Sequence, residues 1–405
     1  MTSRVGSPNR SPHRAFLAAV PTLALFACGG DSAPIADAVV EDSAGVPIIQ
    51  YAQVPEVDPP FALADEPTYR HGDDPDHYSF GRIGEGRLFP DGRAALADVA
   101  NTEVIVLSSD GSRHDILARE GQGPGEIDYV TDMFVLGPDS LLILDRNQGR
   151  FSLFANGSLA HTASIVDLRR ATSLWPKGID ATGRFLVSTG SYRSGFEEEW
   201  LYGHLARYDP ESGAVDTVAS YKFVSGDSNP IPGMGRVIVS GGQFIYVRSD
   251  NPEVVWYLAD GTMRQIVRWQ LERRYMTEEY LAGLKPTLRD RLRFANPGMS
   301  DERLEEVTME HMARYEADLG NPISHFSPPF ADGEGRVWLP KFIPGGPREG
   351  APPYTVVSPD GAWLRMVDGP PGLRILDVGW GRVLGIVEDE MGAESVVVYE
   401  LVDAG

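Results

Sequence analysis

The chain has 405 residues, with 36 Lys and Arg against 58 Asp and Glu, so its formal net charge is −22. This acidic excess argues against nucleic acid and anionic lipid headgroups as partners held by general electrostatic attraction. One Cys among the 405 residues excludes a disulfide within the chain and a Cys-rich zinc or iron–sulfur site. Apolar residues make up 42% and charged residues 23%, as in ordinary folded globular proteins.

The N-terminus has the composition of an export signal. The first 14 residues contain three arginines and no acidic residue, and an apolar run follows from 15 to 27. A helix that stays in a bilayer needs about 20 apolar residues, so this run is too short. We predict that residues 1–27 form a secretory signal peptide.

The signal ends at the chain's single cysteine. The sequence Leu25-Phe26-Ala27-Cys28-Gly29 resembles the lipobox of bacterial lipoproteins, in which the Cys becomes the lipid-modified first residue. We therefore expect lipid attachment at Cys28, a tether over 28–45, and export to the cell envelope, on its periplasmic or outer-membrane face. An ordinary signal peptide with an incidental Cys, and hence a secreted protein, is the alternative. Apart from the lipid anchor, we expect no contact with a membrane.

Turn signals recur along the remaining chain. Asp-Gly or Asn-Gly pairs stand between alternating apolar runs, as at Asp91-Gly92 and Asp110-Gly111. These pairs favour type I′ hairpin turns, which need positive φ at both central residues. The glycines at 92 and 111 lie 19 residues apart, and so do those at 242 and 261. This spacing predicts a repeated antiparallel meander.

Counting the repeats gives six units of about 46 residues, close to the length of a four-stranded propeller blade. The predicted units are 78–127, 128–170, 171–224, 233–272, 326–368 and 371–402. We therefore predict an all-β chain that forms a six-bladed β-propeller over 46–405. A seven-bladed ring or a two-domain β-sandwich is the alternative.

The last predicted unit offers only three strands. An apolar segment, Val46–Tyr51, lies near the expected mature N-terminus and has no other assignment. We expect this segment to supply the missing outer strand, because closure of the ring removes two exposed sheet edges.

Between the fourth and fifth units the apolar period changes from two to nearly four, which indicates helices over about 275–325. Thr277 and Ser300 precede acidic residues and are suitable helix starts. The insert is either a structural cover over one propeller face or a lid or partner-docking surface, since insertions in repeat folds gather on one face.

Three segments carry a family resemblance: Asp42–Ile49, the Gly-rich loop Arg119–Glu126, and Gly335–Leu339. Together they look like the bacterial six-bladed β-propeller lipoproteins with NHL-like repeats. The resemblance implies a secreted or lipid-anchored propeller, generally without an assigned reaction. NHL-like blades keep an Asp at a strand end, matched here by Asp98 and Asp145. Three later blades depart from the pattern at the corresponding positions, with Ser188, Arg248 and Pro340.

Polar residues near the expected channel mouth are the candidate binding residues. They are Arg119, Glu120, Gln122, Glu126, Asp98, Asn101, Asp145 and Asn147. The alternative interpretation is structural: the Gly-rich loop makes a tight crossover between blades, and Asp and Asn at strand ends accept hydrogen bonds from turn backbone.

No catalytic motif is recognised: the sequence lacks His-Glu-x-x-His, Gly-x-Ser-x-Gly and a Cys/His set at metal-binding spacing. We therefore favour a binding or scaffold protein for a small molecule, a glycan or a protein partner, without a cofactor. The alternative is a lactonase-like hydrolase or lyase at the channel mouth, with a divalent cation such as calcium. Convergence of three or four carboxylates and amides from different blades would favour this enzyme.

Overall fold

The computed structural model describes residues 38–55, 61–72, 78–164, 174–189, 201–223, 235–249, 252–296, 298–316, 319–321, 323–342, 354–365, 369–370, 372–389 and 392–403. These residues all belong to one compact unit, Ile35–Gly405. The predicted signal peptide and its lipid-attachment residue, Cys28, lie outside the described residues.

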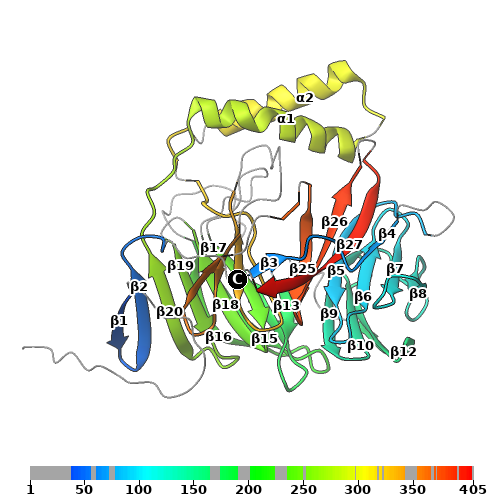
Figure 1. The fold of residues 1–405 in the computed structure, drawn as a ribbon, viewed down its shortest axis with the longest axis horizontal. Coiled ribbons are helices and arrows are strands. Elements are labelled where there is room, and N and C mark those ends of the chain that lie inside the picture. Colours follow the sequence, from blue (N-terminus) through cyan, green and yellow to red (C-terminus); the bar gives the residue numbers. More distant parts are fainter. Residues whose placement is uncertain are drawn as a thin grey trace, which may run out of the picture. The chain divides into compact units, whose positions relative to one another are not determined.

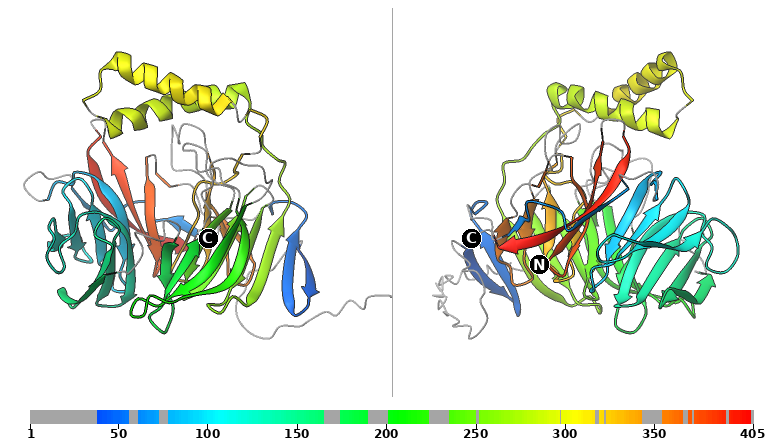
Figure 2. Two further views of the ribbon diagram at one scale, coloured as in Figure 1. Left: turned by 180° about the vertical axis from the view of Figure 1, so that it is seen from behind. Right: turned by 45° about the vertical axis from the view of Figure 1, so that its right-hand side comes forward.

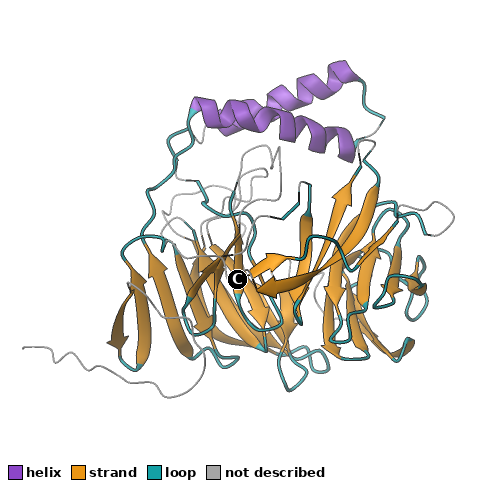
Figure 3. Cartoon of the chain, viewed as in Figure 1, coloured by secondary structure: helices purple, strands orange, loops and turns teal. Residues whose placement is uncertain are grey.

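The unit is a six-bladed β-propeller, as predicted (Figure 1). Each blade is an antiparallel meander of consecutive strands, and strands dominate the whole unit (Figure 3). The strands of blades one to three are β5 (Ile83–Leu88), β6 (Ala94–Asp98), β7 (Glu103–Leu107) and β8 (His114–Arg119); β9 (Val130–Gly137), β10 (Ser140–Asp145), β11 (Arg150–Ala155) and β12 (Ser158–Ser164); and β13 (Leu174–Ile179), β14 (Phe185–Thr189), β15 (Leu201–Tyr208) and β16 (Val215–Phe223).

The remaining blades have the same meander, and the fourth and sixth gain strands from the N-terminal segment. Their own strands are β17 (Gly235–Ser240), β18 (Gln243–Arg248), β19 (Glu253–Tyr257) and β20 (Met263–Trp269); β21 (Phe330–Ala331), β22 (Val337–Pro340), β23 (Tyr354–Val357) and β24 (Trp363–Arg365); and β25 (Arg374–Gly379), β26 (Arg382–Glu388) and β27 (Glu394–Asp403).

The first strands of the blades surround a central channel. Neighbouring first strands contact each other, as β25 does with β5, β5 with β9, β13 with β17, and β17 with β21. In the described part of the chain, apolar side chains form one core cluster between each pair of successive blades. Because burial of apolar area is the main favourable term in folding, these six interfaces hold the ring together.

The expectation for Val46–Tyr51 is wrong. These residues form β2, which pairs in parallel with β20 and so extends the fourth blade. Later strands of the N-terminal segment, β3 (Phe61–Leu63) and β4 (Tyr69–His71), pair with β27 and complete the sixth blade. The physical reason is apolar burial: Ile49 and Tyr51 belong to the core cluster between the fourth and fifth blades.

The strand before β2 also differs from the expected tether. Ala38–Ser43 forms β1, which pairs antiparallel with β2 and is the outer edge of the six-stranded fourth sheet. Five of its six residues are exposed, so backbone hydrogen bonds rather than buried side chains hold it in place. Its small and acidic side chains therefore resemble those of a linker.

The insert between the fourth and fifth blades is a helical hairpin, as predicted (Figure 2). Its helices are α1 (Glu278–Ala295) and α2 (Asp301–Tyr315). The predicted starts are confirmed, since the side chains of Thr277 and Ser300 accept hydrogen bonds from backbone N–H groups of the first turns. The hairpin has a small apolar core of its own, which includes Leu284 and Met312. In the described residues, neither helix combines the length and apolarity that a bilayer crossing requires.

Candidate functional site

The channel has two different ends. At the entry end the first strands begin, and the helical hairpin, which joins the last strand of blade four to the first strand of blade five, is attached there. At the exit end each first strand turns into the second strand of its blade. The predicted binding residues and the principal channel cavity lie at different ends.

A cavity of about 650 Å³ occupies the exit end, and all six blades line it. We call it the exit-end cavity. Its lining includes seven ionisable or aromatic side chains that the first strands and their turns present, namely Arg87, Phe134, Lys177, Asp180, Asp332, Asp377 and Trp380. Cavities of this volume accommodate small organic ligands.

Arg87 connects the first two blades at this cavity. Its Nε donates to the carbonyl oxygen of Met133 at 3.0 Å, and its Nη2 donates to Oδ1 of Asp132 at 3.0 Å. Its Nη1 lies 3.0 Å from a carboxylate oxygen of Glu85. About a quarter of the Arg87 and Asp132 side chains is exposed, 26% and 25%. The guanidinium is thus already paired with two carboxylates, those of Asp132 and Glu85.

The negative charges of two aspartates beside this guanidinium are only partly balanced by neighbouring positive charge. Burial, with a smaller contribution from the charge of Glu85, raises the pKa of Asp132 to about 6, although Arg87 and Lys177 oppose the shift. Burial likewise raises the pKa of Asp377 to about 6, although Arg87 opposes the shift and the backbone N–H of Leu88 donates to Asp377 Oδ2 at 2.8 Å. A carboxyl whose pKa is raised lacks sufficient neighbouring positive charge and solvent.

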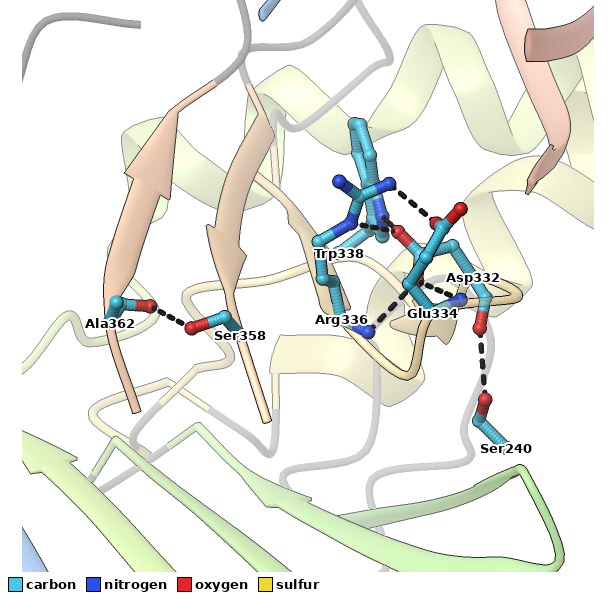
Figure 4. Close-up of polar contacts among 7 residues, drawn as sticks. All are labelled: Ser240, Asp332, Glu334, Arg336, Trp338, Ser358 and Ala362. Carbon is cyan, nitrogen blue, oxygen red and sulfur yellow. Dashed lines mark hydrogen bonds and ion pairs between the residues drawn. The ribbon is translucent and has the colours of Figure 1, made fainter. Parts of the chain in front are cut away.

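Of these two aspartates only Asp377 lines the exit-end cavity, together with Asp180 and Asp332. Asp332 is fully engaged (Figure 4). Its Oδ2 accepts from Trp338 Nε1 at 2.7 Å and from Arg336 Nε at 2.6 Å. Its Oδ1 accepts from the backbone N–H groups of Glu334 and Arg336, and its carbonyl oxygen accepts from Ser240. Because its side chain has no exposed area, Asp332 stabilises the turn after β21 and is not offered to a ligand.

Trp380 has an unusual backbone at the rim of the exit-end cavity. It forms the two-residue turn between β25 and β26 with Gly381, and both residues have positive φ, 51° and 70°. This is the sign that a type I′ turn requires, but Asn, Asp and Gly are its usual first residues. The indole lies against Gly333, where a Cβ would be 3.8 Å from the ring, and 45% of the residue stays exposed.

The strand-end aspartates predicted from the sequence lie near the entry end. Asp98 is 1% exposed, and its carboxylate accepts hydrogen bonds from four backbone N–H groups and from the amide of Asn101. Asp145 is 2% exposed and accepts from the backbone N–H groups of Asp128, Tyr129 and Gln148. Asn147 lies exposed in the turn that follows. Both aspartates thus accept hydrogen bonds from backbone N–H groups of nearby turns.

The Gly-rich loop connects β8 to β9, and Arg150, the first residue of β11, holds it in place. Its guanidinium donates to the carbonyl oxygens of Gln122, Gly123 and Glu126. The Glu126 carboxylate accepts from the backbone N–H of Gly123 at 2.6 Å. Arg119 and Glu120 at the start of the loop are exposed. The structure therefore brings the loop residues together as a crossover, separately from the exit-end cavity.

Sequence reasoning missed the channel residues. A signal was present: Arg87, Lys177 and Asp377 are charged residues inside the first strand of a blade, where apolar residues prevail. Which side chains of a first strand face the channel axis depends on how the closed ring is arranged. The sequence pattern alone therefore did not identify these three residues as channel residues. In the described residues, no three His, Cys, Asp or Glu side chains converge so as to hold a metal ion.

No family model matches this sequence. No curated protein matches it either. Among solved structures, the chain is similar to a candidate exported protein of Bacteroides fragilis, with 11% identity over 88% of this chain and 100% of that one, and a TM-score of 0.51. A second likeness is to regucalcin, a calcium-binding protein of Agrobacterium tumefaciens, at 11% identity over 85% and 97% of the two chains and a TM-score of 0.41. At such identities, what this chain shares with its structural neighbours is the β-propeller fold.

Proposed function

We propose that this protein is an extracytoplasmic binding protein that holds a small molecule in the exit-end cavity. One observation carries the proposal: residues of all six blades line an open cavity of about 650 Å³, and Arg87, Lys177, Asp377 and the partly exposed Trp380 are among them. A concave site with an aromatic side chain and a few polar groups is the usual form of a ligand pocket.

The rigidity of the site also supports binding. Arg87, on blade one, is fixed by two hydrogen bonds to β9 of blade two, and Asp377 is fixed by the backbone of β5. A pre-formed site loses little conformational entropy when a ligand enters, which improves affinity.

A ligand screen against matched variants tests the proposal. Leu136 lines the exit-end cavity and is 46% exposed, whereas Leu258 is 39% exposed in an outer turn of blade four. The purified protein is screened by thermal shift with amines, amino acids, sugars and nucleotides. We expect a ligand of the cavity to lose much of its stabilising shift in Leu136→Trp, whose larger ring intrudes into the cavity, and to keep it in Leu258→Trp. A shift that survives Leu136→Trp would locate the ligand elsewhere and overturn the proposal.

The location in the cell is part of the same proposal. Support comes from the arginine-rich start, the apolar run over 15–27 and the lipobox-like ending at Cys28. Incorporation of labelled fatty acid into the wild type but not into Cys28→Ser is the expected result. Release of unlabelled wild-type protein to the medium would favour the ordinary signal peptide instead.

A further inference from the structure

We propose that the ligand of the exit-end cavity is an organic cation, whose ammonium group lies between the Trp380 indole and the carboxylate of Asp377. This inference rests on the proposed function and specifies the chemistry of the ligand. Three observations lead to it. Trp380 is partly exposed and has a strained backbone, carboxylates outnumber cationic groups around the cavity, and Arg87 is already paired with carboxylates of the protein.

The tryptophan is held in a conformation that its side chain does not favour. A bulky residue at positive φ costs roughly 1–2 kcal/mol relative to Gly, and Asn or Gly would satisfy the same turn. Trp380 nevertheless occupies the turn, rests one part of its ring against Gly333 and leaves 45% of itself exposed at the cavity. Strain of this kind at a cavity rim points to a functional role.

The charges around the cavity favour a positive ligand. Asp180, Asp332 and Asp377 line the cavity against two positive groups, Arg87 and Lys177. Two further carboxylates, Glu85 and Asp132, pair with Arg87 outside this lining. The guanidinium of Arg87 already pairs with Glu85 and Asp132, which leaves it poorly placed to bind an anion. An ammonium group gains from the carboxylates by Coulomb attraction and from the indole face by a cation–π contact.

The raised pKa values of Asp132 and Asp377 agree with this assignment. Arg87 from β5, Lys177 from β13 and Asp332 beside β22 are the other charged groups that act on these two carboxyls, together with Glu85 from β5. A bound cation favours the ionised carboxylates, so by linkage its affinity falls as they take up protons below pH 6.

The experiment compares choline with its neutral isostere 3,3-dimethylbutan-1-ol and with the anion 3,3-dimethylbutanoate, by calorimetry on the purified protein. Choline is expected to bind at least about tenfold more tightly than the neutral compound, as a desolvated cation–π contact requires. The affinity for choline is expected to fall by about tenfold from pH 7.5 to pH 5, one pH unit below the raised pKa values.

Two variants separate binding from folding. Trp380→Asn relieves the turn and is expected to raise Tm by about 2 °C, while weakening choline at least about tenfold. Asp377→Asn keeps an oxygen acceptor for the N–H of Leu88 and is expected to remove the pH dependence that Asp377 causes. A gain in Tm together with a loss of affinity cannot come from misfolding.

The outcomes distinguish the organic-cation ligand from the broader proposal that the exit-end cavity binds a small molecule. Tighter binding of the neutral compound or of the anion, lost in Leu136→Trp, would overturn the organic cation and retain the ligand cavity. Choline binding that is unchanged in Leu136→Trp and Trp380→Asn would overturn both. Absence of binding by all three probes at millimolar concentration would overturn the organic cation alone, and the broader screen above would then decide whether the cavity binds a ligand.

Discussion

The hydroxyl of Tyr51 donates a hydrogen bond of 2.9 Å to the carbonyl oxygen of Gly361, although the two residues are 310 positions apart. Tyr51 lies on β2, in the sheet of the fourth blade, and Gly361 lies in the turn before β24 of the fifth. The ring of Tyr51 also meets Trp363 edge-on, with 5.9 Å between centroids. The N-terminal strand therefore fastens two neighbouring blades as well as extending one.

Removal of the Tyr51 hydroxyl tests this fastening. Tyr51→Phe keeps the ring contact but leaves the buried Gly361 carbonyl without this donor, so we expect a loss of about 1 kcal/mol in the free energy of unfolding. Denaturant unfolding measures the change. Tyr129→Phe, at a tyrosine that is 51% exposed, is the matched control and should have no effect. Equal stability of the two variants would show that the hydrogen bond does not contribute.

Gly361 itself should not tolerate a side chain. Its φ is +88°, and an added Cβ would lie 2.1 Å from Cδ1 of Ile49 on β2. Gly361→Ala therefore combines backbone strain with a clash, and we expect a loss of about 3 kcal/mol. Gly157→Ala is the control, since its φ is +72° but no atom lies within 4 Å of the added Cβ. A loss in Gly361→Ala no greater than in this control would contradict the close approach of β2.

Asp98 is predicted to be a structural residue of the first blade. Its carboxylate, 1% exposed, accepts from the backbone of Gly81, Arg82 and Ala100, among others. Asp98→Ala removes the shared acceptor of these donors, which are only partly buried, and we expect a loss of about 2 kcal/mol. Asp115→Ala, at an exposed position on β8, should be neutral. Thermal unfolding followed by circular dichroism measures both, and full stability of Asp98→Ala would leave the residue available for a binding role.

Local sequence signals predicted the local structure well. Asp91-Gly92 and Asp110-Gly111 mark hairpin turns, but only the glycine of each pair has positive φ, so the prediction of type I′ turns at these two pairs is wrong. Thr277 and Ser300 cap the helices. The repeated pattern of alternating apolar residues predicted the number of blades correctly, because each blade is a meander of strands that follow one another in the sequence.

Long-range relationships were harder to predict. The pattern of Val46–Tyr51 indicates a strand, but the choice between two free sheet edges depends on which inter-blade core receives Ile49 and Tyr51. Trp380 gave no turn signal, since its bulky side chain is untypical of the position that it occupies. The exit-end cavity likewise exists only when six first strands meet at the axis.

The protonation of Asp377 should be visible in the stability of the protein. Burial raises its pKa from 3.8 to about 6, so between these pH values the folded state holds a proton that the unfolded chain releases. The free energy of unfolding therefore decreases as pH rises through this window, and the ionised carboxylate remains a cost above it. Asp377→Asn has no charge to bury, and we expect it to be about 3 kcal/mol more stable than the wild type at pH 7.5. Guanidinium unfolding at pH 4, 5, 6 and 7.5 measures the difference, which should vanish at pH 4. A constant difference across the series would mean that Asp377 is ionised throughout, with Arg87 as sufficient compensation.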